Sequence, residues 1–139
     1  MTGSRVVVDA SAFAEYLLGT LLGRQVAVRL DRADVHAPHL LVVETLSVLR
    51  GWLLSGQLTP DRAQAAVADL QDYPLTLWDS RPLAPDILAR RHNLSSYDAT
   101  YAALAQVLDA PLLTTDGRLA AGAGSTLVQL VALDRAPGE

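Results

Sequence analysis

Short apolar runs alternate along this chain with longer segments that have the apolar spacing of helices. This alternation constrains the fold most, because it predicts parallel strands joined by helices that cover both faces of one sheet. Strands are expected at 5–10, 34–38, 74–79, 111–116 and 126–133, and helices at 11–19, 20–33, 39–56, 59–73, 81–93 and 95–110, with a short helix or loop at 117–124. The predicted fold class is α/β, with a short, mainly parallel sheet of about five strands.

Length and composition indicate a single domain. The chain has 139 residues, and we expect one domain at 1–133 followed by a frayed tail at 134–139. It contains no cysteine, which excludes disulfides, thiolate nucleophiles and cysteine-ligated zinc or iron–sulfur clusters. The apolar segment 40–49 is interrupted by Glu44 and is too short to span a membrane, and the N-terminus lacks the apolar core of a signal peptide. We therefore expect a soluble, cytoplasmic protein.

Acidic residues lie where a parallel sheet collects its ligands. Asp9 ends the first strand and Asp116 ends a later one, so both are expected at the same edge of the sheet. Glu44 lies among apolar residues, where packing does not favour a carboxylate unless it faces solvent or an internal partner such as an arginine. Asp98 is in the first turn of a helix, where Ser95 and Asp98 also match the spacing of a capping box.

These four carboxylates, from four separate segments, could meet at one edge of the sheet. Such a cluster repels itself and raises the pKa of each member unless a cation neutralises it. Sites made only of oxygen ligands suit Mg²⁺ or Mn²⁺. A bound metal of this kind activates water for attack on a phosphodiester, which makes metal-assisted hydrolysis the favoured chemistry.

Other side chains have structural interpretations. Tyr97, Tyr101, Leu104 and Leu108 form a stripe at helical spacing, which is typical of a core-facing helix. His36 and His39 are interpreted as surface or capping residues.

Several rival classes are excluded by missing residues. All eleven basic residues are arginines, so the lysine that haloacid-dehalogenase phosphatases and response-regulator receivers use is absent. The first strand is followed by SAFAEY rather than a glycine-rich dinucleotide loop, and the chain contains no G-x-S-x-G nucleophile elbow. The net charge of -4 also argues against a nucleic-acid binder with a broad basic surface.

The segments VVVDAS, VVETLSVLR and YDATYAALAQVLDAPLLTTDGRLA, in this order, resemble the PIN-domain nucleases, and in particular the VapC-type toxins of bacterial toxin–antitoxin pairs. The resemblance implies a three-layer α/β/α sandwich, usually dimeric, that cleaves RNA, often transfer RNA, with Mg²⁺ or Mn²⁺. It also implies a VapB-like antitoxin that covers the pocket. By this resemblance the metal-binding and catalytic acids are Asp9, Glu44, Asp98 and Asp116, and the supporting hydroxyl residues are Ser11 and Thr115.

The predicted function is a metal-dependent endoribonuclease that acts as the toxin of such a pair. The alternative is a PIN-like module without significant catalysis, which binds an antitoxin and helps it to repress a promoter. Candidates for contacting phosphate are Arg50, Arg90, Arg91 and Arg118, although surface arginines are more often only solvated.

Overall fold

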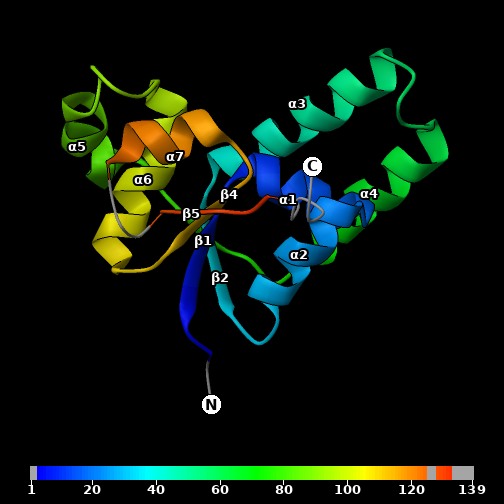
Figure 1. Ribbon diagram of the computed structural model, residues 1–139, viewed down its shortest axis with the longest axis horizontal. Helices are drawn as coiled ribbons and strands as arrows, with labels where there is room; N and C mark the ends of the chain where they lie inside the picture. Colours follow the sequence, from blue (N-terminus) through cyan, green and yellow to red (C-terminus); the bar gives the residue numbers. More distant parts are fainter. Residues whose placement is uncertain (1–2, 125–127, 133–139) are drawn as a thin grey trace, which may run out of the picture.

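A parallel sheet of five strands forms the centre of the molecule (Figure 1). The structure is a computed structural model that describes residues 3–124 and 128–132, so the expected tail at 134–139 lies outside the described residues. The strands are β1 (Arg5–Val8), β2 (Asp34–Pro38), β3 (Thr76–Trp78), β4 (Leu112–Thr114) and β5 (Val128–Leu130), in the order β3-β2-β1-β4-β5. Every strand pair is parallel, as predicted.

Helices cover the two faces of this sheet. On one side lie α1 (Ala10–Leu18), α2 (Leu21–Leu30), α3 (Leu40–Leu54) and α4 (Pro60–Asp72), and on the other lie α5 (Ala84–Ala89), α6 (Ser96–Leu108) and α7 (Gly117–Ala123) (Figure 1). The predicted three-layer α/β/α sandwich is therefore confirmed. Among the residues that the structure describes, no helix is both long and apolar enough to cross a membrane.

The continuous helix predicted at 81–93 is wrong. The segment begins with a 3₁₀ turn at Arg81–Leu83, continues as α5 and leaves helical geometry after Ala89. Pro82 and Pro85 each lie in the first turn of one of these two pieces. Proline has no N–H to donate and is tolerated at the start of a helix but not in its interior, which explains the division.

Small residues allow helices to pack closely in two places. Alanines of α6 are buried between this helix and the sheet, among them Ala99, Ala102 and Ala103. In α2, a Cβ atom added to Gly23 would lie 1.9 Å from the carbonyl oxygen of Glu15 in α1. The glycine is therefore required where α2 crosses the backbone of α1.

The predicted core stripe of α6 is correct in three of its four members. Tyr101, Leu104 and Leu108 are buried. Tyr97, however, is 62% exposed, so its assignment to the core was wrong. The first turn of α6 lies beside the carboxyl edge of the sheet, where Tyr97 and Asp9 line the same pocket, rather than against the face of the sheet.

His36 is likewise misassigned by the sequence interpretation. It lies within β2, between β1 and β3, and is only 5% exposed. The indole N–H of Trp78 is 2.9 Å from His36 Nδ1, which must accept because the indole only donates. The other ring nitrogen, Nε2, then donates to Asp34 Oδ2 at 2.9 Å. His39 is exposed and makes no side-chain cap at the start of α3.

Candidate active site

Asp9 lies where the central strand β1 gives way to α1. Its backbone N–H donates to the carbonyl of Leu113 in β4 at 3.1 Å, which continues the pairing of the two strands. Its extended conformation makes it the N-cap of α1, where Oδ1 accepts from the Ala12 N–H at 2.9 Å. The carboxylate is only 4% exposed. The buried valines of β1 and the start of α1 thus fix this acid at the carboxyl edge of the sheet.

Two hydroxyl groups complete the surroundings of Asp9. Ser11 Oγ donates to Oδ1 at 2.7 Å, and the Thr114 hydroxyl donates to Oδ2. Despite these donors, burial raises the pKa of Asp9 to about 6, and the nearby charge of Asp116 adds to the increase. The group therefore carries a proton well above the usual range of an aspartate unless positive charge is supplied.

Thr114, which was not among the expected supporting residues, supplies a hydroxyl that contacts Asp9. Thr114 follows Leu113 in β4, and Leu113 pairs with Val8, so Thr114 and Asp9 are the next residues along the two strands. Thr115 contributes its backbone N–H, which donates to Ser11 Oγ at 3.1 Å. The register between β1 and β4 is the signal that identifies Thr114, and it is available only once the pairing is known.

Glu44 projects from α3 and is partly buried. Its Oε1 accepts a hydrogen bond of 2.6 Å from the Tyr101 hydroxyl, so its internal partner is a tyrosine rather than an arginine. Burial raises the pKa of Glu44, the Tyr101 bond opposes this, and the charge of Asp98 raises the pKa further. Tyr101, which the sequence analysis treated only as a core residue, therefore also orients this acid.

Asp98 lies in the first turn of α6, and Asp116 directly precedes α7. Ser95 is the N-cap of α6, and its Oγ accepts from the Asp98 N–H at 3.1 Å, which is the capping role expected from the sequence. Asp116 is the N-cap of α7 and accepts from the Arg118 N–H at 2.9 Å. Burial raises the pKa of Asp98, and so does the charge of Asp116, while Arg118 has the opposite effect. The Asp116 side chain thus caps α7 and also raises the pKa of Asp98.

All four acids line one pocket at the carboxyl edge of the sheet. Its volume is about 480 Å³. Its lining comes from α1, α3, α6 and the residues that follow β1 and β4, and consists of Asp9, Ala10, Ser11, Leu40, Val43, Glu44, Ser47, Val48, Tyr97, Asp98, Tyr101 and Asp116. Within residues 3–124 and 128–132, no three acidic or histidine side chains are grouped as a ready metal site.

The donor chemistry of the pocket nevertheless fits a hard divalent cation. Its four charged side chains are all carboxylates, which are the oxygen ligands that Mg²⁺ and Mn²⁺ prefer. The pKa values of Asp9, Glu44 and Asp98 are each raised by a neighbouring acid as well as by burial. A cation bound among these acids would relieve both effects.

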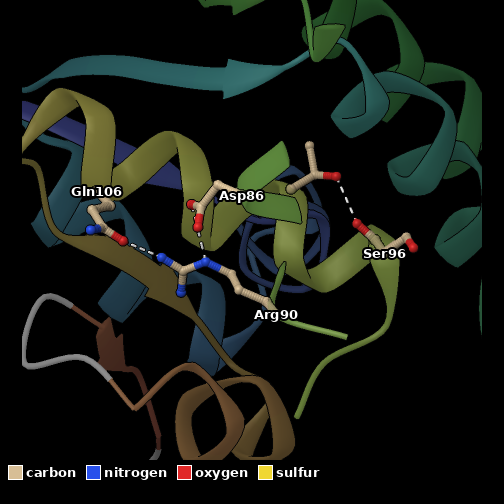
Figure 2. A network of polar contacts seen from close by, with 5 residues as sticks. Asp86, Arg90, Ser96 and Gln106 are labelled. Atoms are coloured by element: carbon tan, nitrogen blue, oxygen red, sulfur yellow. Dashed lines mark hydrogen bonds and ion pairs between the residues drawn. The ribbon is translucent and has the colours of Figure 1, made fainter. Parts of the chain in front are cut away.

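The four candidate arginines differ in their surroundings, and Arg50 is an exposed residue of α3. Arg90 donates from Nε to Asp86 at 3.2 Å and also bonds the side chain of Gln106, while Ser96 begins α6 nearby (Figure 2). Arg91 donates to the Leu88 carbonyl at 3.3 Å. Arg118 is exposed and close enough to Asp98 to lower its pKa. Arg118 is therefore a better candidate for contacting phosphate beside the pocket than Arg90, which is bound to an acid.

Comparisons with known proteins agree with this architecture. The crystal structure of PAE2754 from Pyrobaculum aerophilum has a similar fold, with a TM-score of 0.67 and 21% identity over 86% of this chain and 79% of that one. Ribonuclease VapC1 of Mycobacterium tuberculosis (strain ATCC 25618 / H37Rv) is 39% identical over 123 residues, which cover 85% of this chain and 90% of the relative.

A second relative is similar over an even larger share of its length. Ribonuclease VapC12 of the same strain is 34% identical over 128 residues, which cover 91% of this chain and 99% of the relative. The family model described as the PIN domain matches residues 6–124, from the first strand to the end of α7. The chain therefore belongs to the PIN-domain family, as a relative of the VapC ribonucleases.

Proposed function

We propose that this protein is a metal-dependent endoribonuclease, which hydrolyses RNA phosphodiesters in the pocket lined by Asp9, Glu44, Asp98 and Asp116. The observation that carries the proposal is the shared pocket of four carboxylates, three of which have a pKa raised by another acid of the set. Packing alone does not favour such a concentration of negative charge. The similarity to proteins named VapC ribonucleases supports RNA as the substrate.

Each side chain has a distinct task in this proposal. Asp9 is the fixed ligand, because two hydroxyls and a backbone N–H hold its carboxylate in one orientation. Glu44, which is bonded to Tyr101, and Asp116, which is bonded to the Arg118 N–H, would supply further oxygen ligands together with Asp98. A bound Mg²⁺ or Mn²⁺ would supply the chemistry of lowering the pKa of a water molecule and stabilising charge on the phosphate oxygens.

The biological setting follows from the same family. We propose that the protein acts in the cytoplasm as a toxin, that residues 1–133 form its single domain, and that it functions as a homodimer. Its natural partner is a VapB-like antitoxin that covers the pocket, and its substrate is a structured RNA such as transfer RNA.

The test combines cleavage and metal binding. The purified protein is incubated with total RNA in Mg²⁺, in Mn²⁺ and in chelator, and new RNA 5′ ends are sequenced against an Asp9→Asn control. We expect specific ends with either metal and none in chelator or with the variant. Cleavage that persists in chelator, or that Asp9→Asn retains in full, would show that the pocket is not the nuclease site. An inactive protein that binds no Mn²⁺ would support the non-catalytic alternative.

A further inference from the structure

Two large apolar side chains lie at the rim of the acidic pocket. Tyr97, in the first turn of α6, is 62% exposed, and Val43 of α3 is 66% exposed. Both line the same pocket as the four acids. A single exposed apolar residue is ordinary, but apolar groups gathered around a concave site with a few charged groups are typical of ligand binding.

The pocket is larger than a metal site requires. A divalent cation takes several of its oxygen ligands from the acids of the wall, so within the pocket it needs room only for the ion and the waters that complete its shell. The pocket has a volume of about 480 Å³. The rest of its lining includes Leu40, Val43, Val48 and Tyr97, and this apolar half of the wall is available to another group. This part of the pocket suits a flat, weakly polar group next to a charged one.

We propose that the apolar half of the pocket binds a nucleobase next to the scissile phosphate, and that Tyr97 is the residue on which this base stacks. The inference rests on the proposed nuclease function and specifies its substrate. Because Tyr97 directly precedes Asp98, a base stacked on its ring would lie beside the acids that hold the reacting phosphate. A base inside a duplex is already stacked on its neighbours, so the nucleotide bound here belongs to a single-stranded or looped segment.

A second copy of this chain is the other class of occupant, and it fits the pocket less well than a nucleotide does, whereas the antitoxin proposed above would compete with the nucleotide for this site. A stable protein–protein contact buries about 800 Å² on each partner, over a surface much wider than one pocket. The apolar rim is instead continuous with the acids, which require a cation before a phosphate can approach. A nucleotide satisfies both halves at once, with its phosphate on the cation and its base on Tyr97 and the α3 wall.

The test uses small probes and the full chain. Adenosine 5′-monophosphate and ribose 5-phosphate are titrated in the presence of Mg²⁺, and the adenine protons are followed by NMR. We expect the nucleotide to bind about 5- to 150-fold more tightly than ribose 5-phosphate, with adenine signals shifted upfield by an aromatic ring. Tyr97→Phe should keep both effects. Tyr97→Ala should lose both, and Tyr97→Leu should lose the upfield shift.

Val107→Ala is the matched control, because Val107 is also on α6, is 64% exposed and is not part of the pocket lining. It should bind both probes as the wild type does. With an RNA that the wild type cleaves, Tyr97→Ala should raise KM by about 5- to 150-fold with little change in kcat, since ground-state binding is removed. A selective loss of kcat would mean that the substitution disturbs Asp98 instead.

The base-binding proposal would be overturned if the wild type bound the two probes equally or bound neither of them. It would also be overturned if Tyr97→Ala bound adenosine 5′-monophosphate as tightly as the wild type does. If Tyr97→Ala changes only self-association in sedimentation, the rim is a protein contact and the proposal is wrong. The nuclease function is judged separately by the Asp9→Asn comparison. If substitution of Tyr97 does not change RNA cleavage, only the base-binding proposal is wrong. If the protein binds the base but cleaves no RNA, only the proposed nuclease function is wrong.

Discussion

Asp9 and His36 are both buried polar residues of the central sheet, but their surroundings differ. The imidazole of His36 has a partner on each nitrogen, Trp78 on one side and Asp34 on the other. The carboxylate of Asp9 accepts three hydrogen bonds and still faces a pocket lined by three more acids. The first network is closed, with a partner on each polar group of the ring, whereas the second is open and gathers four acids.

This difference separates a structural polar group from a functional candidate. A buried group with all its partners present stabilises one arrangement of the chain and needs no ligand. The pKa of Asp9 is raised to about 6 by burial and by a neighbouring acid. The protein alone therefore does not supply enough donors or positive charge to balance the negative charge of this carboxylate. The comparison predicts that changes at Asp9 affect activity and metal binding, whereas changes at His36 affect folding.

The largest expected effect is the loss of RNA cleavage on substitution of Asp9, the acid that faces the open pocket. Asp9→Asn keeps an oxygen to cap α1 but removes the charge that a cation requires. We expect RNA cleavage in saturating Mn²⁺ to fall by more than about 100-fold, beyond the effect typical of a residue that only supports a metal ligand. The circular dichroism spectrum should stay unchanged. A cleavage rate within tenfold of that of the wild type would show that Asp9 is not an active-site residue.

The next effect concerns the hydroxyl that orients Asp9. Thr114→Val keeps the shape of this buried side chain but removes its donor to Asp9, so the carboxylate becomes less well fixed. We expect Mn²⁺ affinity in isothermal titration calorimetry to fall by about 10- to 100-fold. Thr76→Val is the matched control, because Thr76 is an exposed strand residue on β3. Equal affinities for the two variants would show that Thr114 has no role at the site.

Substitutions in the closed network around His36 should lower the free energy of unfolding and leave RNA cleavage unchanged. His36→Phe leaves the indole N–H of Trp78 and the carboxylate of Asp34 without their partner. We expect the free energy of unfolding in urea to fall by about 2 kcal/mol, with RNA cleavage unchanged for the folded protein. His39→Phe, at an exposed position, should stay within about 0.5 kcal/mol of the wild type. Loss of activity in folded His36→Phe would contradict the distinction between the two regions.

The smallest effect is on the stability of the metal-free protein. Because the pKa of Asp9 is raised from 3.8 to about 6, the folded wild type holds a proton that the unfolded chain has lost. This contribution to stability is present below about pH 4 and disappears as the pH rises through about 6. In chelator at pH 7, Asp9→Asn should therefore be more stable by about 1–2 kcal/mol.

The pH dependence and the metal provide the checks on that prediction. The stability difference between Asp9→Asn and the wild type, measured by thermal melting in chelator, should grow between about pH 4 and pH 6 and then level off. Added Mn²⁺ should reverse its sign, because only the wild type gains from the cation. A difference that is constant across this range would mean that Asp9 does not titrate in the folded protein as its burial implies.

Much of the fold was predictable from patterns within single segments. The valines before Asp9 and the Thr59–Pro60 start of α4 are local signals, and they locate these elements correctly. The positions of Asp9 and Asp116 after strands were sufficient to predict that they lie at the same edge. Patterns confined to one segment fail where the outcome depends on which strands pair.

The residues whose surroundings the sequence interpretation missed share that dependence. Thr114 contacts Asp9 because of the register between β1 and β4, which no local pattern encodes. His36 is buried because β3 pairs with β2 and brings Trp78 to it. Tyr97 has the spacing of a core residue, yet the first turn of α6 lies at the edge of the sheet and leaves its ring exposed.

The pairing of β1 with β4 also affects when the site can form during synthesis of the protein. Asp9 receives a hydrogen bond from a residue 105 positions later in the chain, and Asp116 lies two positions beyond that donor. A chain growing on the ribosome has no complete pocket until the segment with Thr114 and Asp116 has emerged. A nuclease built in this way cannot act while the segments before β4 are still being made.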